Sequence, residues 1–197
     1  MKLNKRIGNI EDFRKRFIRG KPFRHIVVSD FLENNDAKKV AEALKKEKFE
    51  EKDSDLFQFR QTGNLKFSRS AKIREFYEFM ASDGRRFVSE ISGIKLNGGV
   101  DIAGSLYIDT DYLLCHDDRL QGRKIAYVFY LCKDFIEADG GALAFLEDLN
   151  GKPGKVRGRH FPKWNSLMLF EVSKKSWHEV EEVIGKKKRY ALGGWIH

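Results

Sequence analysis

The sequence predicts an α+β fold in which N-terminal helices buttress a double-sheet β structure of the jelly-roll type. In the first half of the chain, apolar residues recur at helical spacing. After Gly99 the pattern changes to short apolar or alternating runs separated by turn residues, which is typical of antiparallel sandwiches and barrels. A length of 197 residues fits a single domain, with a helix-rich support over residues 1–98 and a β core over residues 99–197.

The helical half contains four apolar periodicities and one short strand pattern. Each periodicity repeats apolar residues every three or four positions, as a helix with one buried face requires. The run Ile26-Val27-Val28, within residues 23–32, suits a buried strand instead. The expected helices are 9–18, one capped by Asn35 or Asp36 that ends near Lys48, one that begins at Ser70, and one through Phe87, Ile91 and Ile94 that stops near 97–99.

The β half contains seven strand-like runs, each bounded by glycine or polar turn residues. Runs this short and this numerous favour a double-sheet arrangement over a single open sheet. The expected strands lie within residues 101–108, 111–116, 124–132, 141–147, 166–172, 177–184 and 188–196.

Composition and charge exclude several classes of protein. Hydrophobic residues make up 41% of the chain, which excludes global disorder, and no apolar run reaches membrane-spanning length. The basic N-terminus is not followed by an apolar h-region, so we expect no secretory signal. Two cysteines cannot form a disulfide scaffold, so we expect reduced thiols in a cytoplasmic or nuclear compartment. The net charge of +9 fits either proximity to the ribosome or RNA, or a lysine-rich solvated surface.

Two histidines and one aspartate form a candidate metal site. His116 and Asp118 lie two positions apart at the end of run 111–116, before a polar turn at 119–122. Side chains alternate along a strand, so both should face one side and Asp117 the other. His178 lies in the separate run 177–184. Two histidines and one carboxylate are the ligands of non-haem Fe(II) oxygenases, and they leave metal sites open for substrate.

Arg189 is the candidate anion-binding residue. It lies eleven residues after His178, where this class of enzyme holds the distal carboxylate of 2-oxoglutarate with a basic side chain. Ala191, Gly193 and Trp195 share its parity, so one face would carry a cation, two small residues and an indole, as a pocket wall does. His160 fits less well as a ligand, because the residue eleven positions after it is Glu171.

Each of these residues also has an ordinary interpretation when it is considered alone. A lone strand histidine such as His178 is typically a hydrogen-bonded structural residue, His116 and Asp118 could be a surface pair, and Arg189 could be a solvated charge beside three lysines. The order, spacing and strand context of all four residues together favour the iron site.

At these residues the sequence resembles the 2-oxoglutarate/Fe(II)-dependent ribosomal-protein prolyl hydroxylases. The resemblance extends from about residue 22 to the end and covers the catalytic domain of that family; eukaryotic members carry a second, degenerate β-helix domain after it. The matching segments are 55–61, 113–118, 122–126, 130–131, 140–143, 164–167, 170–173, 178–180, Arg189 and 194–195.

The resemblance implies a double-stranded β-helix (cupin-like) fold and an enzyme that uses Fe(II), 2-oxoglutarate and O2. It implies that the enzyme hydroxylates a prolyl residue of a small-subunit ribosomal protein. The iron ligands would be His116, Asp118 and His178, and Arg189 would bind the C5 carboxylate of 2-oxoglutarate. Tyr107 and Tyr130 match cosubstrate-binding positions, Trp195 matches a position near the substrate pocket, and residues 51–68 match a segment that covers the active site.

Two other functions remain open at this point. A nucleic-acid oxygenase of the demethylase type would use the same three ligands, and the net charge of +9 would suit its substrate. A non-enzymatic ribosome- or RNA-binding module could keep the fold as a scaffold. Loss of Fe(II) or Mn(II) binding would favour the module, whereas turnover stimulated by methylated oligonucleotide would favour the demethylase.

Overall fold

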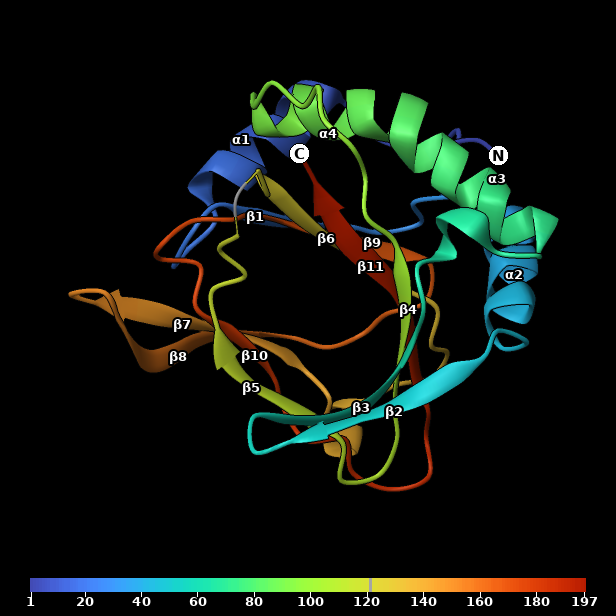
Figure 1. The fold of residues 1–197 in the computed structure, drawn as a ribbon. Coiled ribbons are helices and arrows are strands. Elements are labelled where there is room, and N and C mark those ends of the chain that lie inside the picture. Colours follow the sequence, from blue (N-terminus) through green and yellow to red (C-terminus); the bar gives the residue numbers. More distant parts are fainter. Residues whose placement is uncertain (121) are drawn as a thin grey trace.

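The computed structural model describes residues 1–120 and 122–197; Gln121, in the turn predicted at 119–122, lies outside the described residues. Antiparallel strands form two facing layers, and helices cover the outside of one layer (Figure 1). Strand order runs β1-β9-β6-β11-β4-β3-β5-β10-β7-β8, with β2 paired to β3. The helix-covered layer therefore contains β4, β11, β6 and β9, and the other contains β5, β10, β7 and β8. This arrangement of two facing antiparallel layers is the double-stranded β-helix that the sequence and its resemblance predicted.

The strands of the helix-covered layer are β1 (His25–Val28), β9 (Ser166–Glu171), β6 (Ile125–Tyr130), β11 (Arg189–Ile196) and β4 (Ala103–Tyr107). The other layer has β5 (Tyr112–His116), β10 (His178–Val180), β7 (Leu143–Leu149) and β8 (Lys152–His160). A hairpin of β2 (Phe49–Ser54) and β3 (Phe57–Thr62) joins the layers, because β3 pairs with both β4 and β5. The hairpin occupies the segment that the resemblance placed over the active site.

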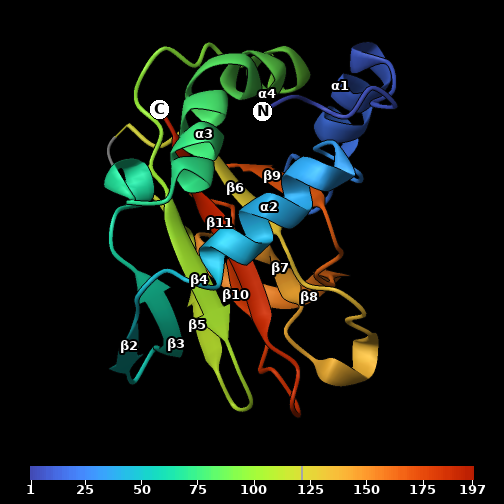
Figure 2. The ribbon, with the colours of Figure 1, turned by 90° about the vertical axis from the view of Figure 1, so that its right-hand side faces the viewer.

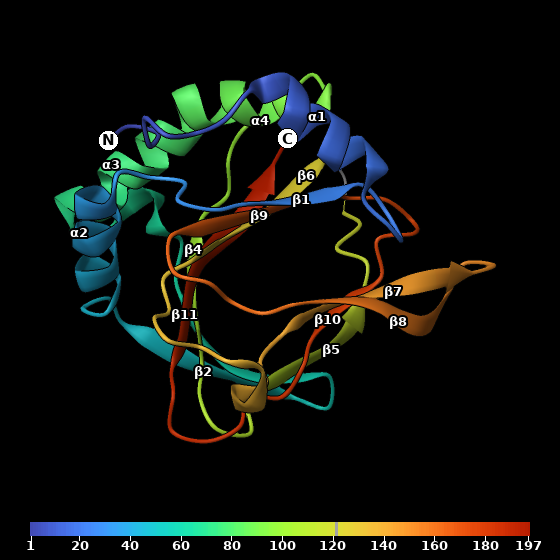
Figure 3. The ribbon, with the colours of Figure 1, turned by 180° about the vertical axis from the view of Figure 1, so that it is seen from behind.

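The helices are α1 (Ile10–Arg19), α2 (Asn34–Leu44), α3 (Ala71–Phe79) and α4 (Arg85–Ser92). A π-helical turn, Met80–Gly84, joins α3 to α4, and short 3-10 turns occur at Leu65–Phe67 and Glu137–Asp139. All four helices lie against the outer face of the layer that contains β9, β6 and β11 (Figures 2 and 3). Within the described residues, no helix combines the length and the apolar character needed to cross a membrane.

The alternation of side chains on β6 shows how the sheet separates the core into two clusters. Ile125, Tyr127 and Phe129 point to the helices and join one apolar cluster, whereas Ala126 and Tyr130 point between the two layers and join the other. The helices are therefore a buttress for the outside of this layer. The space between the layers is left for the residues that carry chemistry.

Some expected elements differ from the structure. Helix α2 is preceded by Glu33 instead of being capped by Asn35 or Asp36, and α4 ends at Gly93, whose φ of 69° stops the helix before the expected end at 97–99. Strand β8 was not expected, because its segment is rich in cations and glycine and lacks apolar alternation. It is an edge strand, where polar side chains are tolerated.

A partly buried ion pair fixes the connection between β4 and β5. Asp111 is fully buried; one of its carboxylate oxygens accepts a 2.9 Å bond from Arg60 Nη1 and a 2.8 Å bond from the Ile108 amide. Replacing Asp111 with alanine leaves Arg60 without this partner and removes the bond to the loop backbone. We expect Asp111→Ala to lower the free energy of unfolding by about 3 kcal/mol or more in urea titrations.

The matched control for this prediction is Asp55→Ala. Asp55 is exposed at the tip of the β2–β3 hairpin, so its removal should change the free energy of unfolding by less than about 0.5 kcal/mol. Equal, small effects of the two substitutions would show that the Arg60–Asp111 pair does not hold the β4–β5 connection.

Candidate active site

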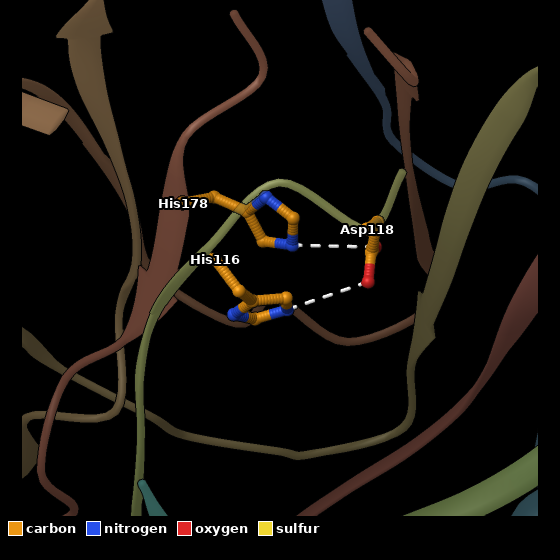
Figure 4. Close-up of side chains that lie close together, drawn as sticks. All are labelled: His116, Asp118 and His178. Carbon is orange, nitrogen blue, oxygen red and sulfur yellow. Dashed lines mark ion pairs between the residues drawn. The ribbon is translucent and has the colours of Figure 1, made fainter. Parts of the chain in front are cut away.

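The three predicted ligands meet between the two layers (Figure 4). His116 ends β5 and His178 begins β10, and the pairing of these strands places the two residues directly opposite each other. Their ring centroids are 4.2 Å apart. The Asp118 carboxylate lies in front of both rings, and one potential ligand atom from each residue lies within 4.8 Å of the others. The structure therefore brings together residues that are 62 positions apart in the chain (178 − 116).

Backbone carbonyls set the orientation of both imidazoles. Nδ1 of His116 lies 2.8 Å from the Leu114 carbonyl oxygen, and Nδ1 of His178 lies 2.7 Å from that of Ser176. These contacts place the ring proton on Nδ1 and leave the lone pair of Nε2 for a metal. The two Nε2 atoms lie 3.4 Å and 3.3 Å from the oxygens of Asp118.

The position of Asp118 is set by a backbone turn after β5 and not by the alternation of side chains along the strand. β5 ends at His116, and Asp118 has a φ of 59°, which turns the chain back toward the histidines. Asp117 faces away as expected: its carboxylate accepts a 3.1 Å bond from the Arg119 amide. The side predicted for Asp118 was therefore right, but a left-handed residue after the strand, and not the strand itself, places it there.

The last strand also orients Asp118. The indole Nε1 of Trp195, on β11, donates a 3.0 Å hydrogen bond to Asp118 Oδ2. The guanidinium of Arg123 lies 3.3 Å from the centroid of the Trp195 ring and donates a bond to the Asp118 carbonyl. Trp195 is thus part of the site wall and holds the candidate ligand in place.

The charges of the site suit a divalent cation. Burial alone would raise the pKa of Asp118, but hydrogen bonds with His116 and His178 outweigh it and hold that pKa well below its usual range. Burial would lower the pKa of His116, but the bond to Asp118 reverses the direction and raises it. An ionised carboxylate and two imidazole nitrogens, all converging on one point, fit the ligand preferences of Fe(II).

Arg189 lies along the same cavity, which has a volume of about 220 Å³ and is also lined by His116, Asp118 and His178. Its side chain is 2% exposed, although no carboxylate of the described residues forms an ion pair with it. Nε donates a 2.8 Å bond to the Gly141 carbonyl. A buried guanidinium without an acidic partner is costly unless an anion binds to it. The cavity therefore has a cation at one place and a candidate metal site at another.

The two tyrosines hold Arg189 from different sides. The guanidinium carbon lies 4.9 Å from the ring centroid of Tyr107, which lines the cavity and stacks on Phe59, and 5.1 Å from that of Tyr130. Tyr130 lies outside the lining and accepts a 3.4 Å bond from Nη2 of Arg189. Burial raises the pKa of both hydroxyls, so both stay protonated at neutral pH. The structure thus brings Tyr107 to the cavity itself and Tyr130 to the far side of Arg189.

Three further site residues are not identifiable as such from periodicity. Gly141 has a φ of 64°, and a Cβ there would lie 2.9 Å from Val183 and 3.2 Å from Arg189 Cδ, so only glycine leaves room for the guanidinium. Phe59 supports Tyr107, and Arg123 supports Trp195. The consecutive glycines Gly140 and Gly141 before a strand are a local sequence signal of a positive-φ backbone at this position.

The remaining histidines lie away from the candidate ligands. His25 and His160 pack against each other with ring centroids 4.8 Å apart, and Phe145 and Phe170 lie between them and His178. His197 contacts Asp101 at 3.0 Å. The rejection of His160 as a ligand therefore agrees with its position in the structure.

His160 makes the stability of the protein depend on pH. Burial, and then the neighbouring His25, lowers its pKa from 6.5 to about 4. As the pH falls from 6.5 to 4, the unfolded chain takes up a proton that the folded protein excludes, so the free energy of unfolding must fall. We expect His160→Phe to flatten this dependence in urea titrations across that range. Parallel curves for the two proteins would contradict the assignment.

Comparison with known proteins assigns this site to a family. Residues 102–197 match the family model described as the 2OG-Fe(II) oxygenase superfamily, and this range contains all three candidate ligands and Arg189. These residues form a domain of this superfamily, whose enzymes use Fe(II), 2-oxoglutarate and O2.

Within the superfamily, the chain is similar to the prolyl 3-hydroxylases named OGFOD1. It is 39% identical over 179 residues to that of Xenopus laevis, covering 89% of this chain and 35% of the relative. It is 36% identical over 182 residues to that of Mus musculus, covering 89% and 33%. The chain thus spans about one third of the length of these relatives.

Solved structures share the fold at low sequence identity. A prolyl-4-hydroxylase of Pseudomonas putida matches with a TM-score of 0.74 and 16% identity, over 94% of this chain and 98% of the other. A prolyl hydroxylase of Trichoplax adhaerens, solved with a hypoxia inducible factor peptide, matches with a TM-score of 0.74 and 16% identity, over 95% and 90%. These matches support the double-stranded β-helix described above.

Proposed function

We propose that this chain is a prolyl hydroxylase domain that acts on a protein, and that the protein is a small-subunit ribosomal protein. The observation that carries the proposal is one cavity that joins the His116–Asp118–His178 cluster to Arg189, which is buried and has no acidic partner in the described part of the chain. The similarity to prolyl 3-hydroxylases supports proline as the target. Two free cysteines, Cys115 and Cys132, support a reducing compartment such as the cytoplasm or nucleus.

The residues of the chain have separate roles in this proposal. His116, Asp118 and His178 would hold iron on one side, and Arg189 would receive the C5 carboxylate of 2-oxoglutarate at the other end of the cavity. Bound iron supplies the oxidising chemistry, in which one oxygen atom of O2 enters the substrate C–H bond and the other enters succinate as CO2 leaves 2-oxoglutarate. Tyr130 positions Arg189, and Trp195 positions Asp118.

A groove beside the cavity gives a substrate polypeptide access to the candidate metal site. It has a volume of about 670 Å³ and shares Phe59, Tyr107 and Trp195 with the cavity. One wall comes from the β2–β3 hairpin, and Gly193 and Gly194 form part of the other. A Cβ at either glycine would crowd a backbone carbonyl oxygen of this chain, that of Tyr127 or of Asp101, so glycine is needed for strand packing at this wall. We infer that the target proline enters along this groove.

The deciding experiment is mass spectrometry of ribosomal proteins incubated with the enzyme, Fe(II) and 2-oxoglutarate. We expect one prolyl residue to gain the mass of one oxygen atom, with stoichiometric succinate. A peptide with that proline replaced by alanine is the control, and it should remain unmodified. Succinate release stimulated by methylated oligonucleotide but not by proline-containing peptides would instead identify a nucleic-acid oxygenase.

A further inference from the structure

The strongest concentration of charge outside the cavity lies on and just after α1. Residues 14–24 carry six cationic side chains and no acidic one, and all six are exposed. We call this stretch the α1 basic segment. Its cations are Arg14, Lys15, Arg16, Arg19, Lys21 and Arg24.

The opposite side of α1 is used for packing, so the basic side is free. Phe17 is fully buried, and Ile10 and Phe13 pack against the same core cluster. Lys15 and Arg19 lie on the opposite, solvent-facing side, whereas Arg14 and Arg16 border the buried face, and Arg16 donates a 3.5 Å bond to the Val27 carbonyl. Arg16 and Arg19 lie in the last turn, where the helix dipole favours cations. That explanation does not extend to Arg14, Lys15, Lys21 or Arg24.

Most cations of the segment have no acidic partner among the described residues. Arg24 contacts Glu171 at 3.7 Å, and the other five form no ion pair with any carboxylate of the described residues. Like charges placed together without acidic partners repel one another, and a polyanion bound across them removes that repulsion.

The basic surface continues toward the rim of the active site. The carbonyl of Arg24 accepts a 3.0 Å bond from the Glu171 amide at the end of β9. Residues 172–176 follow and expose Lys174 and Lys175, and the Ser176 hydroxyl then donates a 3.0 Å bond to the carbonyl of Asp117. Figure 3 shows α1 beside β1 and β9. A long polyanion on α1 would therefore pass close to the candidate iron ligands.

We propose that the α1 basic segment is a docking surface for the phosphodiester backbone of a nucleic acid. Four of the six cations are arginines, whose planar guanidinium groups bind phosphate oxygens bidentately. An anionic membrane fits less well, because Ile18 is the one large apolar side chain that the described part of α1 exposes. The choice of RNA as the nucleic acid rests on the proposed ribosomal substrate. The binding of phosphate groups by these cations is independent of that substrate.

Fluorescence anisotropy with labelled RNA tests the proposal without iron or turnover. The probes are a single-stranded RNA of about 20 nucleotides, the corresponding RNA duplex and the corresponding DNA duplex. The variant R14Q/K15Q/R16Q/R19Q removes four charges from the segment. The matched control K38Q/K39Q/K45Q/K46Q removes four exposed charges, two from α2 and two from the residues just after it. Circular dichroism and thermal unfolding establish that both variants fold.

We expect the α1 variant to weaken RNA binding by more than about tenfold and to lower the slope of log K against log salt by about 3 for single strands. The α2 control should bind within about twofold of the wild type, since its lysines would contact no phosphate. A third variant, R14K/R16K/R19K, keeps the charge and should retain the salt dependence. If the glutamine variant fails to fold, K15Q/K21Q should still weaken binding relative to K38Q/K39Q.

Several outcomes would overturn the proposal. Equal losses in the α1 and α2 variants would show that net charge alone drives binding, and no loss in either would place the surface elsewhere. Binding to vesicles of equal parts phosphatidylcholine and phosphatidylserine, but not to RNA or DNA, would identify a membrane surface. Preference for the DNA duplex would retain the phosphate site but reject RNA. Hydroxylation of a short prolyl peptide is measured separately, so its failure would reject the proposed function and not the docking surface.

Discussion

Asp118→Asn is expected to abolish Fe(II)-dependent turnover while the protein stays folded. Asparagine has the shape of aspartate and tolerates the positive φ at this position, but it lacks the charge that would balance the metal. Loss of a group that merely orients a ligand typically weakens metal binding by 10–100-fold, so loss of a ligand should exceed about 100-fold. Mn(II) titration followed by electron paramagnetic resonance measures the binding, and succinate formation measures the turnover. His116→Ala and His178→Ala should have the same effect.

Asp117→Asn is the matched control, because the neighbouring carboxylate faces Arg119 and not the histidines. It makes the same chemical change one residue away. We expect it to retain metal binding and turnover within about threefold, because this carboxylate does not line the cavity. Full activity of Asp118→Asn, His116→Ala or His178→Ala, or equal losses in the two asparagine variants, would contradict the proposed metal site.

Arg189→Ala should chiefly raise the KM for 2-oxoglutarate. The guanidinium is buried at the cavity wall and pairs with no carboxylate in residues 1–120 and 122–197, so a bound carboxylate would depend on it for charge and for hydrogen bonds. Losing hydrogen bonds to a charged group costs about 1.5–3 kcal/mol, which is roughly 10- to 150-fold in binding. Arg189→Lys keeps the charge but not the planar fork, and we expect an intermediate KM. Initial rates of succinate formation at varied 2-oxoglutarate provide the measurement.

Arg159→Ala is the control for this second prediction. Arg159 lies on β8, is partly exposed and pairs with Glu181, away from the cavity lining. Its removal should leave the KM for 2-oxoglutarate within about twofold, because it contacts no residue that we assign to the cosubstrate. An unchanged KM in Arg189→Ala would reject the carboxylate clamp while leaving the metal site untouched.

Local periodicity was sufficient to predict much of the fold and to identify the types of residue that form the site. The alternation along β11 correctly put Arg189, Gly193 and Trp195 on one face, because a strand fixes side-chain direction at every second residue. It could not find β8, whose sequence lacks apolar alternation, nor the role of Gly141, which depends on the approach of Arg189 from another strand. The π-helical turn between α3 and α4 also has no local periodic signal.

The sequence by itself determined the chemistry that was available: two imidazoles, one carboxylate and one guanidinium on strand-like segments of the right order. The tertiary structure decided that these groups meet. His116 faces His178 because β5 pairs with β10, and the backbone turn at Asp118 brings its carboxylate in front of them. It also decided that Arg189 is buried with no acidic partner among the residues that the structure describes. Strand pairing brings together residues that are distant in the chain, and burial depends on how the whole sheet packs. No local sequence pattern can therefore specify which residues pair or which become buried.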